Sequence, residues 1–322
     1  MFVENLKTIA IQVLMLYIIA GIGFAADKFG VFTRDDAKRV INLLFNIILP
    51  IAVVHSFLSI EYSAQHVTGL FIAFACAAAT HLFGMGVSAI AFRKRKSVLE
   101  RGLLQYGTVF SNAAFLALPL AQNVIGDEGV FYCSVYIGVF NIFAFTYGIF
   151  VISGKKAKIN AKKIILNPGT ISVIIGIPLF LLRVKLPHII DYPMELAGGI
   201  NSPLAMIIFG TFLANANLKN VFIKKEIFFV SFLRLVFIPV VMTLLFKLCG
   251  VSGDLLTAMS ISASAPTATN TAMYAAKYDN DAGLGSEIAA QTSILSVVTM
   301  PVVVALLSLI HISEPTRLRC IS

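Results

Sequence analysis

The chain of 322 residues has few charged side chains and no tryptophan. Charged residues make up 13% of it and hydrophobic residues 58%, and this composition excludes an ordinary soluble domain. Without tryptophan, anchoring at a membrane interface falls to tyrosine and to the long lysine and arginine side chains. The mean hydropathy of +0.89 indicates instead a protein that crosses the membrane many times.

Cysteine and acidic residues are also scarce. The four cysteines show neither C-x-x-C spacing nor a neighbouring histidine cluster, so the sequence predicts neither a disulfide framework nor a metal site. The acidic residues cluster near the ends of the apolar segments, which weakens the case for a proton pump. Paired aspartates in mid-membrane and a helical H-E-x-x-H are absent, which argues against an intramembrane enzyme.

The apolar residues form ten segments of roughly transmembrane length. They cover residues 9–26, 40–58, 67–92, 103–125, 130–152, 164–182, 196–214, 227–248, 255–276 and 288–310. The predicted fold is therefore an all-α membrane protein of ten transmembrane helices. A short basic linker, 153–163, divides the chain into one five-helix repeat at 1–152 and a second at 164–310. Residues 311–322 lack an amphipathic period and are predicted to be a non-native or disordered tail.

Prolines recur at a similar spacing in the two halves. Pro50 in the second segment has a counterpart in Pro203, and Pro119 in the fourth has one in Pro266, about 150 residues later. Because each half has five spans, the second copy enters the membrane from the opposite side, which predicts an inverted repeat. The alternative is that the prolines of the two halves match by chance. Proline inside a span removes a backbone donor, so segments 4 and 9 are predicted to be broken and to cross.

Lysine and arginine gather in the loops that follow the odd-numbered segments, at 28–39, 93–101, 155–163, 219–225 and 277. The excess of positive charge on cytoplasmic loops places these loops in the cytoplasm. Both termini are then extracytoplasmic, in a plasma (inner) membrane of prokaryotic type. Because the basic residues lie between apolar segments, the net charge of +9 indicates orientation in a lipid bilayer and no nucleic-acid partner.

Polar residues beside the two predicted breaks are candidate ligands of the substrate. Asn112, preceded by Ser111, is the first choice, because an amide donates to a carboxylate and accepts from a neighbour. Thr267, Thr269 and Asn270 are the matching residues of the ninth segment. Half-helix N-termini would add exposed N–H groups that favour an anion. The alternative for each side chain is a hydrogen bond within or between helices.

Three further residues are candidates for the site. Arg234, well inside an apolar segment, either attracts the substrate and acts in gating or extends to the membrane surface. Asn141 and Asn46 either line the cavity or link helices, and the sequence does not separate these roles. No cofactor or metal is predicted, and Na⁺ and H⁺ remain open as coupling ions.

Motifs from Asn42 to Pro301 resemble those of the auxin efflux carrier family, which includes plant PIN-type exporters and bacterial permeases for malate-like acids. They include I-N-L-L-F-N-I-I-L-P, F-S-N-A-A-F-L-A-L-P and A-P-T-A-T-N. The resemblance implies crossed fourth and ninth helices, a homodimer and a carboxylate-bearing substrate. It also implies that Asn112 contacts the carboxylate and that Pro119 and Pro266 form the crossover. The linker is too short for the regulation by phosphorylation of many plant members, and the third segment lacks their acidic residue, which argues against auxin itself as the substrate.

The leading hypothesis is a secondary carrier or facilitator of a small organic anion, malate-like, that binds at the crossover. One five-helix unit would move against the other in alternating access. The close alternative is a sodium-coupled organic anion symporter of the bile acid transporter type, which a dependence on the sodium gradient would distinguish. A membrane sensor or structural protein is a third hypothesis, but it gives no reason for two matched breaks.

Overall fold

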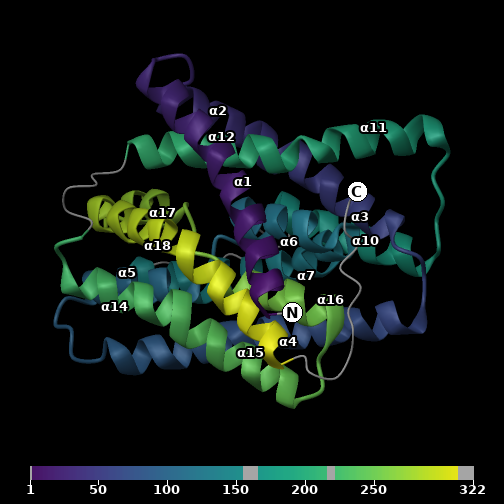
Figure 1. Cartoon of the computed structure of the whole chain (residues 1–322). Coiled ribbons are helices and arrows are strands. Elements are labelled where there is room, and N and C mark those ends of the chain that lie inside the picture. Colours follow the sequence, from purple (N-terminus) through teal and green to yellow (C-terminus); the bar gives the residue numbers. More distant parts are fainter. Residues whose placement is uncertain (1, 155–165, 216–221, 311–322) are drawn as a thin grey trace.

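The computed structural model describes residues 2–154, 166–215 and 222–310, and these residues form helices without a β-strand (Figure 1). Seven of the helices in these ranges are long and apolar enough to cross a bilayer. They are Ala10–Lys28, Arg34–Ser59, Ala64–Ala91, Asp127–Ile152, His188–Ala214, Lys225–Leu248 and Ala282–Ala305. The prediction of an all-α membrane protein is therefore confirmed. The predicted tail, 311–322, and most of the linker, 153–163, lie outside the described residues.

Each of the seven spans matches one predicted segment. Their elements are α1 (Phe2–Lys28), α2 (Arg34–Leu43) with α3 (Leu49–Ser59), α4 (Ala64–Ala91), α7 (Asp127–Phe143) with α8 (Ile149–Ile152), α11 (His188–Gly199) with α12 (Asn201–Ala214), α14 (Lys225–Phe232) with α15 (Ile238–Leu248), and α18 (Ala282–Ile310). The other three segments contain shorter helices. These are α5 (Val98–Val109) with α6 (Leu118–Ile125), α10 (Pro168–Leu181), and α16 (Gly253–Ser264) with α17 (Thr271–Lys277).

Three prolines inside the spans follow a widened helical turn and not a break. The π-helical turns Leu44–Ile48, Ala113–Ala117 and Leu233–Phe237 each end two residues before a proline. A proline has no N–H to donate and its ring crowds the carbonyl one turn earlier, so the helix accommodates an extra residue there. Pro119 thus lies in α6, and the interruption of the fourth segment falls earlier, between Val109 and Ala113. The break that the sequence placed at Pro119 is corrected accordingly.

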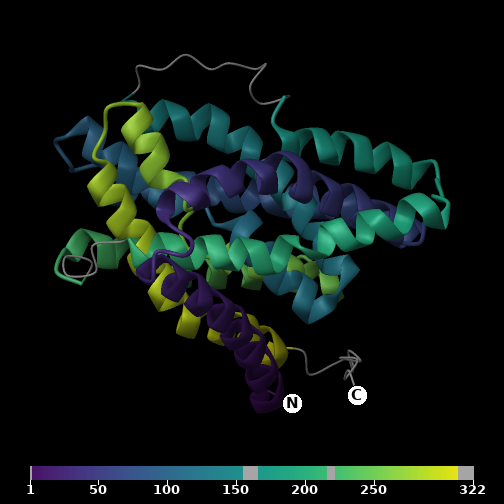
Figure 2. The same ribbon diagram turned by 90° about the horizontal axis from the view of Figure 1, so that it is seen from above.

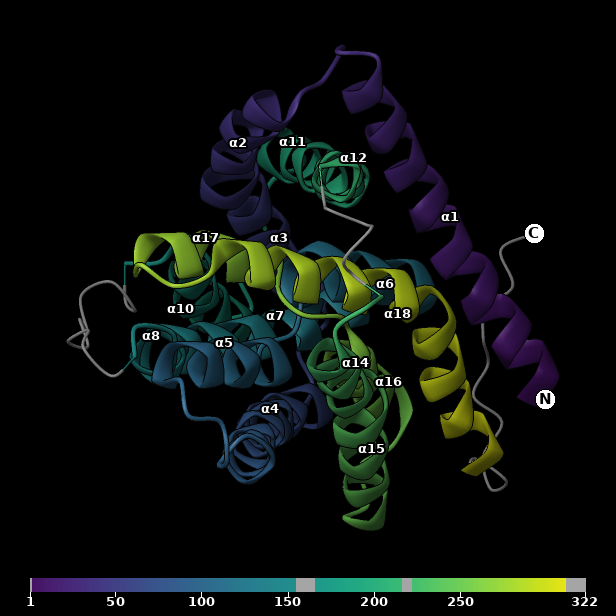
Figure 3. The ribbon, with the colours of Figure 1, turned by 90° about the vertical axis from the view of Figure 1, so that its left-hand side faces the viewer.

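The helices pack in two groups, and each group draws on both halves of the chain. The first helix group contains α1, α2, α3, α10, α11 and α12; α1 packs along α12, and α3 packs on α10 and α11. The second helix group contains the remaining helices, with α7 packed on α4, α6 and α16. The two groups touch broadly, because α7 also packs on α3 and α10 and α18 packs on α1. Figure 3 shows α2, α11 and α12 above α17 and α18, with α4 and α15 below.

Two glycines bring α1 and α12 into close contact. A Cβ atom at Gly210 would lie 1.8 Å from the carbonyl oxygen of Ala20, and one at Gly23 would lie 2.0 Å from that of Ile207. Small residues allow helices to approach this closely inside a membrane. On its other side α1 runs beside α18 (Figure 2). There the Tyr17 hydroxyl donates to the Ser293 carbonyl at 2.7 Å, and this bond connects the two helix groups.

Candidate functional site

The interruptions of the fourth and ninth segments lie against each other. The N–H of Asn112 donates to the carbonyl of Pro266 at 2.6 Å, and the N–H of Ala268 donates to the carbonyl of Phe110 at 2.9 Å. Together these bonds form a single antiparallel bridge, which pairs Ser111 of the first interruption with Thr267 of the second. The backbone groups that the two interruptions release therefore satisfy each other, as they must where water is excluded.

Thr267 strengthens this pairing with bonds of its own. Its hydroxyl donates to the carbonyl of Gly107 in α5 at 2.7 Å, and its N–H donates to the Thr292 hydroxyl of α18 at 3.1 Å. Thr267 is fully buried, so these contacts fix the ninth segment to both neighbours. The hydroxyl of Thr267 is thus engaged in holding the interruption together.

Arg234 binds the helix ends that precede both interruptions. Its side chain is 0% exposed, and it donates from Nε to Ala265 O (3.0 Å), from Nη1 to Val109 O (3.0 Å) and Thr108 O (3.4 Å), and from Nη2 to Ala263 O. The last carbonyls of a helix lack partners and carry the negative end of its dipole, so a guanidinium is well matched to them. The expectation that Arg234 extends to the membrane surface is wrong.

The charge of Arg234 has no acidic partner in the described part of the chain. None of the ion pairs among described residues includes it. The Tyr136 hydroxyl of α7 lies close to Arg234 and to Ser111. The guanidinium is therefore balanced by the carbonyl ends of two helices and a hydroxyl, and not by a carboxylate.

Asn112 retains a free hydrogen-bond donor. The residue is 3% exposed, and its side-chain nitrogen donates to no described atom. A buried amide donor without an acceptor costs about 1–3 kcal/mol. An acceptor oxygen on a ligand would remove that cost.

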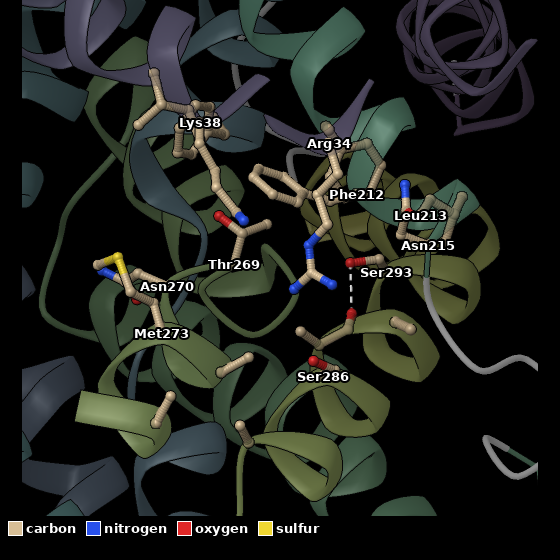
Figure 4. Close-up of a pocket in the computed structure, with 18 of the residues that line it drawn as sticks. Arg34, Lys38, Phe212, Leu213, Asn215, Thr269, Asn270, Met273, Ser286 and Ser293 are labelled. Atoms are coloured by element: carbon tan, nitrogen blue, oxygen red, sulfur yellow. Dashed lines mark hydrogen bonds between the residues drawn. The ribbon is translucent and has the colours of Figure 1, made fainter. Parts of the chain in front are cut away.

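A cavity of about 490 Å³ lies next to the second interruption, between the two helix groups (Figure 4). The first helix group contributes α2 and α12 to its walls, and the second contributes α17 and α18. Its lining is largely aromatic and aliphatic, and it contains no aspartate or glutamate among the described residues. The polar lining residues are Arg34, Lys38, Asn42, Asn215, Thr269, Asn270, Ser286 and Ser293.

The structure brings some of the predicted site residues together and leaves others apart. Thr269 and Asn270 line the cavity, and Ser111, Asn112 and Thr267 lie in the paired interruptions behind it. Asn270 also accepts a hydrogen bond from Tyr106 at 3.4 Å. Asn141 and Asn46 are not in the lining: Asn141 donates to Asn167 at 3.1 Å, and Asn46 donates to a carbonyl of its own helix at 2.7 Å.

Arg34, Lys38 and Asn42 line the cavity, although they were not predicted as site residues from the sequence. They follow one another at intervals of four residues, so they lie on one face of α2. The two cations were interpreted from the sequence as loop charges that set the orientation in the membrane. Arg34, Lys38 and Asn42 recur every four residues, and Asn42 carries this polar face into the apolar segment. That spacing is the signal that would have identified the polar face.

Comparison with known proteins identifies the family of this chain. Residues 8–304 match the family model described as membrane transport protein, that of the auxin efflux carriers and PIN-like proteins. The chain belongs to this family. No curated protein matches the chain. The resemblance seen in the sequence motifs is confirmed, and this integral membrane protein is a transporter of the auxin efflux carrier type.

Proposed function

We propose that this transporter carries a small organic anion with a malate-like carboxylate and binds it in the cavity beside the paired interruptions. The observation that carries the proposal is the cavity itself. It lies between two helix groups, it receives Thr269 and Asn270 from the second interruption, and its lining holds cations but no described carboxylate. Its volume of about 490 Å³ falls in the range of about 300–1,000 Å³ that is usual for small-molecule sites.

The buried charge of Arg234 supports an anionic substrate. Its guanidinium is bound to the residues before both interruptions, and it is not neutralised by a described acidic residue. A charge in a medium of low dielectric acts over a longer range than one in water. An anion at Asn112 or Asn270 is therefore attracted, whereas a cation is repelled.

The transporter is further proposed to form ten spans as a 5+5 inverted repeat whose fourth and ninth helices cross at the paired interruptions. The antiparallel bridge between Ser111 and Thr267 supports this topology, because two copies inserted in opposite directions would meet in that way. The extracytoplasmic termini, the plasma membrane location, the homodimer and coupling to Na⁺ or H⁺ stay predictions from the sequence.

Alternating access would use the boundary between the two helix groups. In the predicted orientation the cavity opens to the cytoplasm, because α2 begins and α17 ends at predicted cytoplasmic loops. Opening to the other side would require the groups to shift where they now touch. One such contact is the bond from Tyr17 to Ser293, and another is the pair of rings Phe45 and Phe115, whose centroids lie 4.8 Å apart.

The test is uptake of radiolabelled malate by proteoliposomes that contain the purified transporter. We expect saturable uptake, and we expect Asn270→Ala to lower kcat/KM about tenfold, since it removes a polar contact of the lining to the anion. Asn112→Ala should lower kcat/KM as well, since it removes the free donor in the paired interruptions behind the cavity. Asn46→Ala is the matched control, because that amide bonds within its own helix outside the cavity. The proposal fails if no monocarboxylate or dicarboxylate shows saturable uptake and Asn112→Ala behaves like the parent.

A further inference from the structure

The cavity holds two cationic side chains that a single carboxylate at the interruption would not use. Arg34 and Lys38 line it from α2, and Figure 4 shows both side chains extending from that helix towards Thr269 and Ser286. Thr269 and Ser286 belong to the second helix group, so the cations and these hydroxyls face each other across the cavity. An anion with two charged ends would meet complementary groups on both walls.

The start of α2 is fixed by a capping box, which holds the two cations in place. The N–H of Thr33 donates to the Asp36 carboxylate at 3.0 Å, and the N–H of Asp36 donates back to the Thr33 hydroxyl at 3.5 Å. Reciprocal bonds of this kind set the first turn of a helix. Because Arg34 and Lys38 are four residues apart, the same face of the fixed helix presents both.

The two cations differ in whether a carboxylate of the protein already pairs with them. The Lys38 ammonium lies 2.8 Å from Asp35, in a pair whose side chains are 58% and 81% exposed, so water screens it strongly. Arg34 forms no ion pair with a carboxylate in the described ranges. Its guanidinium offers five donors in a planar arrangement that fits the two oxygens of a carboxylate. Arg34 is therefore the stronger candidate of the pair.

We propose that Arg34 and Lys38 bind a second carboxylate of the substrate and make the transporter selective for dicarboxylates over monocarboxylates. This inference rests on the proposed function, because it assigns one end of the anion to Thr269 and Asn270 and the other end to α2. A monocarboxylate reaches only one wall of the cavity. It leaves the cations of α2 hydrated and gains nothing from them.

Malate and lactate form a matched pair of probes, because both are 2-hydroxy acids and malate carries one more carboxylate. Uptake of each is measured in phosphatidylcholine proteoliposomes for the parent and for Arg34→Gln and Lys38→Gln. We expect each substitution to raise the KM for malate about fivefold, the upper end for an exposed ion pair. The KM for lactate should stay within about twofold of the parent. Arg34→Lys, which keeps the charge, should recover part of the malate affinity.

The matched control is Arg39→Gln, which removes a cation from the same helix at a position outside the cavity lining. Equal effects of Arg34→Gln and Arg39→Gln on malate would mean that surface charge alone is responsible, and this overturns the inference. So does a parallel change in the KM values of malate and lactate. An effect that appears only after phosphatidylglycerol is added would assign the two cations to lipid headgroups instead.

Failure of the proposed function looks different in the same assay. If the parent transports neither malate nor lactate, the function and this inference fall together. If the parent transports both with equal KM, and Asn270→Ala impairs both while Arg34→Gln impairs neither, the function stands and only the dicarboxylate site is overturned.

Discussion

Replacement of Arg234 tests whether the paired interruptions depend on its guanidinium. Arg234→Met keeps most of the side-chain volume and removes all donors to the carbonyls of Thr108, Val109, Ala263 and Ala265. At about 1–3 kcal/mol for each buried acceptor left without a partner, the four lost bonds cost about 4–12 kcal/mol. Removing a buried cation returns several kcal/mol of desolvation free energy, so we expect a net loss of stability of about 3–5 kcal/mol.

The assay is thermal unfolding of the detergent-solubilised transporter, followed by loss of the monodisperse peak in size-exclusion chromatography. A loss of about 3–5 kcal/mol corresponds to a fall in Tm of about 6–10 °C at about 2 °C for each kcal/mol. Arg234→Lys keeps the charge but loses the planar set of donors, and it should fall between the parent and Arg234→Met. Arg93→Met, at an exposed loop position, is the control. A Tm of Arg234→Met within about 1 °C of the parent, with normal malate uptake, would refute the reasoning.

Two further predictions concern packing and pH. Gly210→Leu should lower Tm by several degrees, because its Cβ would lie 1.8 Å from the Ala20 oxygen, whereas Gly21→Leu, with nothing within 4 Å of its Cβ, should leave Tm unchanged. Burial raises the pKa of the Asp254 carboxyl to about 6, and a hydrogen bond with Glu128 and the negative charge of that residue add to the rise. The folded state therefore holds the carboxyl proton of Asp254 more tightly than the unfolded state does. Stability should therefore fall as the pH rises from about 4 to about 6, and thermal unfolding of Asp254→Asn across that range should show a smaller fall.

The long spans could be predicted from the sequence, because a run of apolar residues of bilayer length has few other folds available. The break of the fourth segment was misplaced for a physical reason: Pro119 is accommodated by a π-helical turn, so its position does not mark that interruption, whereas Pro266 does lie within the second one. Ser111 and Asn112 are better markers, since a strand-like pair of polar residues in mid-span needs partners outside its own helix. The contact of these residues with the second interruption joins distant parts of the chain, and no local pattern predicts it.

Arg234 shows a second limit of reasoning from the sequence. Its distance from the predicted membrane surface allowed the side chain to extend there, and only the packing of α5 and α16 reveals four carbonyls within its reach. The cavity shows a third limit. Arg34 was counted for the sign of its charge in a loop, although its interval of four residues from Lys38 already placed both on one helix face.

The position of Arg234 also indicates which parts of the proposed carrier move together. It joins the eighth segment to α5 and α16, and all three belong to the second helix group. Both interruptions are thereby fixed to one body, together with Thr269 and Asn270. Arg34 and Lys38 belong to the other group, so any shift between the groups changes the distance between the two walls of the cavity. A dicarboxylate that binds both walls would favour the state in which they are close, and its binding energy would then act directly on the motion that transports it.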